Sequence, residues 1–281
     1  MLLRNALWAI ERNLHGELTI ARIAEACGVS RFHLAHALAS GTGVPIMHYV
    51  RARRLSVAAR ALLDSGDGVL TVALDAGYGS HEAFSRAFKA QFGVTPEGFR
   101  RDPELSRIVP PMALPEVTDM RLEEPEIVEA PAMLAVGLSE RHGISNPERI
   151  PSQWARFMRE YFGLVPHRLP GIPVALNRMT DDESQLDYTC AVLVSRIDDV
   201  PAGLEAIRIP AQTYAVFTHL DHVSALPRTY GAIWNEWFPS HPWQPVNTVG
   251  LERHLETFDP ATGWGGVALW IPVEPGKAAP S

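Results

Sequence analysis

Hydrophobic residues in the first hundred positions recur every three or four residues, the spacing that gives an α-helix one buried face. The pattern occurs twice, about fifty residues apart, and each copy contains two short helices separated by a glycine. In the first copy Thr19 is placed to cap one helix, Gly28 to end it, and Ser30 to cap the next. The corresponding residues of the second copy are Thr71, Gly77 and Ser80. The pattern therefore predicts two helix-turn-helix units in tandem.

A longer helix is predicted between the two copies. Pro45 suits a first helical turn, and residues 46–63 contain no helix breaker before the turn sequence Ser65-Gly66-Asp67-Gly68. About 18 residues at about 1.5 Å each give a rod of about 27 Å. Such a rod can hold two recognition helices near one DNA turn apart, about 34 Å, so we expect one chain to read two successive major-groove segments.

Charge separates this helical region from the rest of the chain. Residues 1–101 carry twelve Lys and Arg against eight Asp and Glu, a net +4, whereas residues 102–281 carry a net −11. A basic region suggests a polyanionic partner. The second copy also holds a glycine turn, a Phe-x-Arg-x-Phe-Lys element at 84–89 and a Gly-x-Thr-Pro element at 93–96. With these elements, residues 5–101 resemble AraC/XylS-type transcription regulators, which implies a domain that binds double-stranded DNA.

Base contacts are expected from exposed positions near the start of each second helix. By spacing these are Arg31, Phe32, Ala35 and His36 in the first copy, and His81, Glu82, Ser85 and Arg86 in the second. Phosphate contacts are expected from arginines past which the DNA backbone would run, namely Arg51, Arg53, Arg54, Arg100 and Arg101. Each of these residues could instead be an ordinary surface residue. His33 is expected to be a partly buried structural residue.

The remaining two-thirds of the chain has a different pattern. Residues 102–119 hold four prolines and no sustained period, so we predict a linker between a domain at 1–101 and a second domain at 120–274, with a tail at 275–281. The expected order in the second domain is strand 126–138, helix 147–164, strands 172–178 and 187–197, then strand 206–219, helix 225–238, and strands 245–257 and 266–273. An offset of 79 to 80 residues aligns the two halves, with Trp154 matching Trp234. The predicted fold is multidomain: an all-α tandem helix-turn-helix domain followed by an α+β domain of duplicated β-α-β-β units, with a cleft on the pseudo-twofold axis.

Four short segments of this domain form a distinctive set: Asp187-Tyr-Thr, Leu251-Glu-Arg-His, Phe258-Asp-Pro and Leu269-Trp-Ile-Pro-Val. With them, residues 120–274 resemble GyrI-like effector-binding domains, which implies that Glu252 faces a ligand cavity. His254, two positions after Glu252, is also expected to contact the ligand. Six of the seven tryptophans lie in this part of the chain, so aromatic walls are expected around the carboxylate, from Tyr188, Trp234 and Trp237. Such a site suits an aromatic or lipophilic cationic molecule. The alternative is that these aromatic residues belong to the core.

Other chemistry has little support in the sequence. The segment His219-Leu-Asp-His222 could suggest a metal, but no cysteine or acidic partner is fixed nearby, so no metal is expected. No nucleophile motif or glycine-rich phosphate loop accompanies Glu252 and His254. We therefore expect no catalytic residue and no cofactor. A small-molecule hydrolase and a protein-binding module remain alternatives for this domain.

Two further features bear on where the protein works. No apolar run approaches the roughly 18 residues that a membrane span needs, and Cys27 and Cys190 are the only cysteines, which suits a reducing cytoplasm. We predict a cytoplasmic transcription regulator, and not an enzyme. It would bind double-stranded DNA through its first domain and a small-molecule effector through its second, with RNA polymerase as a further partner.

Overall fold

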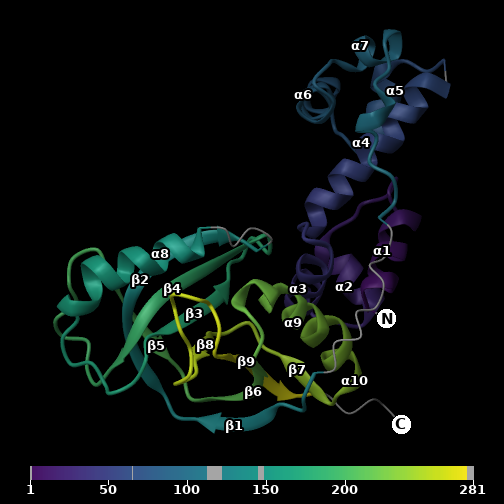
Figure 1. The fold of residues 1–281 in the computed structure, drawn as a ribbon. Coiled ribbons are helices and arrows are strands. Elements are labelled where there is room, and N and C mark those ends of the chain that lie inside the picture. Colours follow the sequence, from purple (N-terminus) through teal and green to yellow (C-terminus); the bar gives the residue numbers. More distant parts are fainter. Residues whose placement is uncertain (1, 65, 113–121, 145–148, 277–281) are drawn as a thin grey trace.

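The computed structural model describes residues 2–64, 66–112, 122–144 and 149–276. Figure 1 shows a helical region beside a large sheet. The helices of the first region are α1 (Leu2–Arg12), α2 (Ile20–Cys27), α3 (Arg31–Thr42), α4 (Ile46–Asp64), α5 (Val69–Asp75), α6 (His81–Phe92) and α7 (Pro96–Arg101). As predicted, α2–α3 and α5–α6 are two helix-turn-helix units and α4 is the long helix between them.

Most helix boundaries follow the capping residues that the sequence offers. The side chains of three predicted N-caps, Thr19, Ser30 and Ser80, each accept a hydrogen bond from the backbone N–H three residues later. Gly28 and Gly77 have φ angles of 69° and 80°, which is the left-handed conformation that commonly ends a helix. The prediction that Thr71 caps α5 was wrong. The helix begins two residues earlier, at Val69, and its N-cap is Gly68 in an extended conformation.

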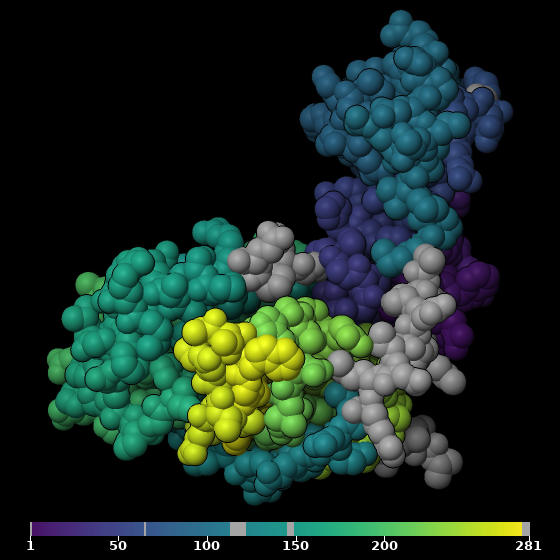
Figure 2. All heavy atoms as spheres, viewed as in Figure 1, coloured from purple at the N-terminus to yellow at the C-terminus, as the bar shows by residue number. Residues whose placement is uncertain are grey.

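The helical region has two cores. Phe84, Phe88, Phe92 and Phe99 form an aromatic cluster under α5–α7 and the second half of α4. The buried residues of α1–α3, in contrast, continue without a break into the sheet domain, so that Leu34, Phe217 and Trp234 belong to one cluster. The first helix-turn-helix unit is thus packed into the sheet domain, whereas the second stands clear of it, as Figure 2 shows.

Part of the predicted linker is bound to α4. After α7 the chain forms a short helix, η1 (Leu105–Arg107), and then runs along α4. The N–H of Val109 donates to Ser56 Oγ at 3.0 Å, and the N–H of Met112 donates to Tyr49 Oη at 3.1 Å. Residues 113–119 of the linker and 277–281 of the tail lie outside the described residues, and the domain boundaries stay a prediction.

The second domain is built on an antiparallel sheet. Its strands are β1 (Glu126–Ala130), β2 (Met133–Gly143), β3 (Val174–Met179), β4 (Gln185–Val194), β5 (Glu205–Ile209), β6 (Gln212–His219), β7 (Trp243–Pro245), β8 (Gly250–His254) and β9 (Val267–Pro275). Their order is β1-β6-β9-β8-β3-β4-β2-β5, with β7 paired to β9. The two halves exchange their first strands, since β1 pairs with β6 and β5 pairs with β2. β3 and β8 meet at the centre, so the predicted duplication is confirmed.

Each duplicated unit differs from the prediction in its first strand and in its helix. The predicted strands 126–138 and 206–219 are each two strands, which break at Pro131 and Pro210 because proline cannot donate to the ladder. In the first half, α8 (Ile150–Arg156) continues through the π-helical η2 (Phe157–Tyr161) into η3 (Phe162–Leu164). In the second, η4 (Val223–Ala225) and α9 (Leu226–Ala232) continue through the π-helical η5 (Ile233–Trp237) into α10 (Phe238–Ser240). The two π-helical segments occupy equivalent places.

Candidate functional site

The centre of the sheet places one acidic side chain among apolar ones. Directly opposite residues of neighbouring strands share a face of a sheet. The register gives one such row, which reads Phe217, Leu269, Glu252, Ala175, Cys190 and Leu138. One end of the row packs with Phe157 of η2, and the other packs with Ile233 of η5. Glu252 therefore lies between the two helices, next to the pseudo-twofold axis.

Two tyrosine hydroxyls hold the Glu252 carboxylate. Tyr188 of β4 donates to Glu252 Oε2 at 3.0 Å, and Tyr230 of α9 donates to Oε1 at 2.8 Å. Trp154 of α8 in turn donates from Nε1 to Tyr188 Oη at 3.2 Å. Within the described part of the chain, no basic side chain forms an ion pair with Glu252. A line of polar contacts thus joins α8, the sheet and α9.

Burial dominates the electrostatics of this site. It raises the pKa of Glu252, against the opposing hydrogen bonds from Tyr230 and Tyr188. Burial, together with the charge of Glu252, also raises the pKa of Tyr188 and Tyr230 well above the ordinary value, so both hydroxyls stay protonated donors. A desolvated carboxylate without a counter-charge favours a cationic ligand.

A group of aromatic rings lies beside the two tyrosines, since Trp154, the hydrogen-bond partner of Tyr188, also contacts His254. The imidazole of His254 stacks on Phe258, with centroids 3.9 Å apart and planes at 13°, and lies 5.6 Å from the ring of Trp154. Burial lowers the pKa of His254, so the ring is neutral at pH 7. The arrangement offers aromatic faces and one negative charge, which is the combination that binds an organic cation.

Three of the five predicted ligand-binding residues lie together in this site, namely Glu252, Tyr188 and His254. Trp234 instead packs on α3, and Trp237 contacts Phe217 and stacks on His241 at 4.3 Å. The residues that sequence reasoning missed are Trp154, Tyr230 and Phe258. Tyr230 lies one helical turn before Trp234 on the predicted helix, so the sequence predicted the helix but not which of its aromatic residues contacts Glu252.

The second recognition helix is open to solvent. Glu82 and Arg86 of α6 are exposed, and His81 Nε2 lies 3.3 Å from Glu97 Oε1 of α7. Hydrogen bonds from its own backbone N–H and from Ser80 lower the pKa of Glu82, so this carboxyl group is ionised at the helix start. Ser85 is half-buried, and its hydroxyl has no hydrogen-bond partner among the described residues. The face carrying Arg86 is accessible to a DNA major groove.

The first recognition helix has the opposite environment. Ala35 of α3 is 3% exposed, so the prediction that it is an exposed position was wrong. Phe32 and His36 are half-buried, and both rings contact Trp234 of η5. Arg31 remains exposed, with its Nη1 3.2 Å from Glu183 Oε1. The sheet domain thus covers Phe32 and His36, two of the four positions that were expected to contact bases.

The predicted phosphate-binding arginines divide in the same way. Arg51 and Arg101 are exposed. Arg53 is buried and forms an ion pair with Glu11, which lowers the pKa of that carboxyl group against the effect of burial. Arg100 donates to the carbonyl oxygens of Leu62 at 2.8 Å and Asp67 at 2.6 Å, and so satisfies acceptors at the end of α4.

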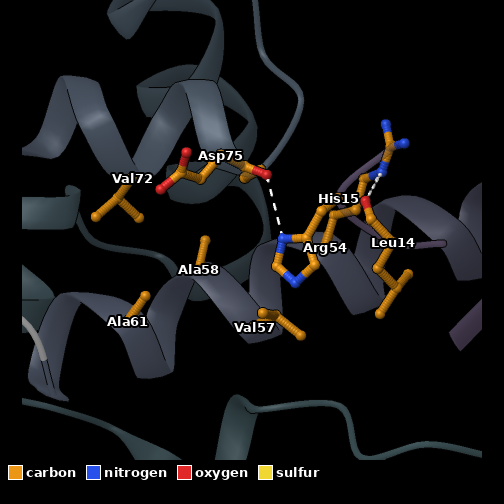
Figure 3. A pocket seen from close by; sticks show the side chains of 9 residues that line it. Leu14, His15, Arg54, Val57, Ala58, Ala61, Val72 and Asp75 are labelled. Atoms are coloured by element: carbon orange, nitrogen blue, oxygen red, sulfur yellow. Dashed lines mark hydrogen bonds between the residues drawn. The ribbon is translucent and has the colours of Figure 1, made fainter. Parts of the chain in front are cut away.

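Arg54 joins α4 to the segment between α1 and α2. Its Nε donates to the carbonyl oxygen of Leu14 at 2.8 Å, and Nη2 donates to that of Gly16. Figure 3 shows this contact at the edge of a small pocket of about 30 Å³, in which the His15 ring points to the backbone oxygen of Asp75 at 3.4 Å. The structure therefore gives Arg54 a packing role.

The histidines of the segment 219–222 also have structural partners. His219 is buried, with Nδ1 2.8 Å from Thr229 Oγ1 and Nε2 3.2 Å from the carbonyl oxygen of His222. Over the described ranges, no group of three or more His, Cys, Asp or Glu side chains is arranged to hold a metal ion. None of the described helices is long and apolar enough to span a bilayer.

Known proteins resemble both regions. Residues 9–102 match the family model of a helix-turn-helix domain, and residues 123–274 match the GyrI-like small molecule binding domain. Right origin-binding protein of Escherichia coli K12 is 30% identical over 229 residues, which are 78% of each chain. This chain belongs to the AraC-type transcription regulators that carry a GyrI-like domain. Transcriptional regulator Rob of Salmonella typhimurium is 29% identical over 230 residues, 78% of each chain, and multiple antibiotic resistance protein MarA of the same species is 32% identical over 91 residues, 32% of this chain and 72% of MarA. This AraC-type regulator thus binds DNA through its helix-turn-helix region and a small molecule through its GyrI-like domain.

Proposed function

We propose that this AraC-type regulator senses an aromatic, lipophilic cation at Glu252 and changes its DNA binding in response. The observation that carries the proposal is the position of Glu252. Its carboxylate lies in an apolar row, with two phenol donors and no basic partner among the described residues. A bound cation would offset the cost of removing water from this charge, and the rings of Trp154 and Phe258 would add stacking and cation–π contacts.

Glu252 acts in this proposal as a binding residue and not as a catalytic base. A hydrolase would need the carboxylate to position a water beside a scissile bond. Both oxygens of Glu252 instead accept hydrogen bonds from Tyr188 and Tyr230. A sensor needs only to exchange one of these bonds for a ligand contact. We accordingly propose a cytoplasmic regulator without enzymatic activity, which acts through RNA polymerase.

Calorimetry with a charged and a neutral probe tests the proposal. Glu252→Gln should weaken binding of tetraphenylphosphonium by about 1.5–3 kcal/mol, roughly 10- to 150-fold, because it removes the charge and keeps the shape. Binding of neutral triphenylphosphine oxide should hardly change. Glu256→Gln, which removes an exposed carboxylate four residues away, is the matched control and should change neither.

Two results would contradict this function. One is an equal loss of both probes in Glu252→Gln, which would make the side chain a shape determinant and not a counter-charge. The other is a loss of tetraphenylphosphonium binding in Glu252→Gln that is no larger than the loss in Glu256→Gln.

A further inference from the structure

The α9–η5 helix of the sheet domain lies beside α3, as Figure 1 shows. His36 stacks on Trp234 with centroids 4.3 Å apart and planes at 9°, and Phe32 meets the same ring edge-on at 5.4 Å. His33 Nε2 lies 2.8 Å from the carbonyl oxygen of Trp234. These contacts come from residues 32, 33 and 36, which lie on adjacent turns of α3, and they leave no room there for a DNA groove.

Polar groups and small residues bring the two helices close together. Asn235 Nδ2 donates to the carbonyl oxygens of Ala37 on α3 at 3.0 Å and of Gly231 on α9 at 3.1 Å. Gly231 itself faces α3, since a Cβ built on it would lie 3.6 Å from the carbonyl oxygen of Ser40. A side chain longer than alanine at position 231 would therefore have to enter the interface.

The same helix carries a residue of the Glu252 site. Tyr230, whose hydroxyl donates to Glu252 Oε1 at 2.8 Å, directly precedes Gly231. A ligand that engages the Glu252 carboxylate competes with Tyr230 for it. Release of this hydrogen bond removes one of the contacts between α9 and the sheet, next to the point where α9 meets α3.

The contact between α3 and η5 is incompletely satisfied. Trp234 Nε1 and Asn235 Oδ1 are both buried, and neither has a hydrogen-bond partner among the described residues. Unpaired buried polar atoms make an interface less stable than a fully paired one. The interface between α3 and η5 is therefore less stable than a fully hydrogen-bonded one of the same size.

We propose that α9–η5 is an intramolecular lock on α3, and that occupation of the Glu252 site opens it. In the closed state the chain reads DNA through α6 alone; in the open state α3 and α6 both enter major grooves. The ligand step rests on the proposed function, whereas the lock itself does not.

Substitution of Gly231 tests the lock without any ligand. The DNA is a duplex selected from a random library with the full chain, and the readout is hydroxyl-radical footprinting. Wild type and Gly231→Ala, whose Cβ fits at ordinary contact distance, should protect one segment. The double variant Gly231→Glu/Asn235→Ala should protect two segments about one helical turn apart and bind roughly tenfold more tightly or better. Calorimetric binding of tetraphenylphosphonium that is at least as tight as in wild type shows that its sheet domain is intact, since a ligand that opens the lock binds more tightly to a chain that is already open.

Two outcomes would overturn the lock. Wild type without ligand could already protect both segments, which would place α3 in a groove in the closed state. Alternatively, the double variant, with its sheet domain intact, could protect no more than wild type does.

A second arm tests the ligand step with tetraphenylphosphonium. Saturating probe should extend the wild-type footprint from one segment to two. Tyr230→Phe, which lacks the hydroxyl that competes for Glu252, should show part of this extension without probe. Calorimetric binding without any change in the footprint would overturn the ligand step and leave the proposed function standing. No binding at all would overturn the proposed function and the ligand step together, and the Gly231 variants would still decide the lock.

Discussion

The two helix-turn-helix units of this chain share a local plan and differ in what surrounds them. In both, a serine caps the recognition helix and a glycine in the left-handed conformation ends it. The cap residues are Ser30 and Ser80, and the end residues are Gly43 and Gly93. Yet α6 presents a charged face to solvent from a separate core, whereas α3 is buried in a core that it shares with the sheet domain.

The residues of the two helices account for this difference. Apart from Arg31, α3 has no Asp, Glu, Lys or Arg, and its buried residues occur on all sides of the helix. A helix that is apolar all round is a buried helix. On α6 the charged residues Glu82, Arg86 and Lys89 leave one apolar face for Phe84, Phe88 and Phe92. One repeated motif therefore gives one free and one covered recognition helix.

The largest expected effect is a loss of stability, and its consequences should differ between the two cores. Phe88 is fully buried at the centre of the aromatic cluster, and Leu38 is its counterpart in the first unit. Phe88→Ala should cost about 3–5 kcal/mol, unfold α5–α7, and abolish DNA binding while tetraphenylphosphonium still binds. Leu38→Ala should cost about 2–5 kcal/mol and weaken probe binding too, because its core includes Trp234 and Phe217. Thermal unfolding and calorimetry on each variant decide the point, and loss of probe binding in both would mean a single shared core.

The next effect concerns DNA affinity in the absence of ligand. Arg86→Ala should cost about 1–3 kcal/mol of binding and relax the preference at one base pair. Arg31→Ala should cost less than about 0.5 kcal/mol, because this residue pairs with Glu183 at the surface of a covered helix. Arg60→Ala, at an exposed position of α4, is a control for the loss of charge alone. Equal losses for Arg31→Ala and Arg86→Ala, measured by titration at fixed salt, would mean that both helices already contact DNA.

A smaller effect is expected from pH. Burial, with a contribution from nearby His33, lowers the pKa of His36 from 6.5 to about 3, and burial also lowers that of His33. The unfolded or released histidine binds a proton more readily than the packed one, so the contact of α3 is fully stable above pH 6.5. It weakens as the pH falls from 6.5 toward 3, by about 1 kcal/mol for the first pH unit.

Footprinting at pH 7.5 and 5.5 measures this change. The wild-type footprint should lengthen at the lower pH, because the charged imidazole leaves its stack on Trp234. His36→Gln cannot take up the proton, and its footprint should respond less to pH. An identical response of wild type and variant would show that another group titrates.

The sequence predicts what depends on local chemistry. Periodicity, caps and glycine turns placed most of the helices, and the offset of 79 to 80 residues predicted the duplicated β-α-β-β units. The sequence could not predict which surfaces of the two domains pack against each other. Trp154 and Trp234 occupy equivalent positions of the duplication, but one hydrogen-bonds to Tyr188 and the other stacks on α3. Only the presence of a neighbouring domain on one side makes their surroundings different.

The arginines also show that the sequence does not determine which groups a polar side chain contacts. Arg54 and Arg100 have the spacing of phosphate-binding residues, yet each donates to backbone oxygens near the end of another helix. A guanidinium group satisfies a carbonyl as readily as a phosphate, so the residue type alone does not decide between packing and DNA contact. Whether an arginine packs or contacts DNA depends on which helix ends lie near it in three dimensions.

The most direct test of the account is the accessibility of α3 compared with that of α6. In a Cys27→Ala background, in which the remaining Cys190 is buried, Ala35→Cys and Arg86→Cys each provide one thiol for labelling by a maleimide. Without ligand, the thiol at position 35 should react at least tenfold more slowly than that at position 86. Saturating tetraphenylphosphonium should bring the two rates close together by accelerating only the first. Equal rates without ligand, or a slow thiol at position 35 that stays slow when the probe is bound, would contradict the account.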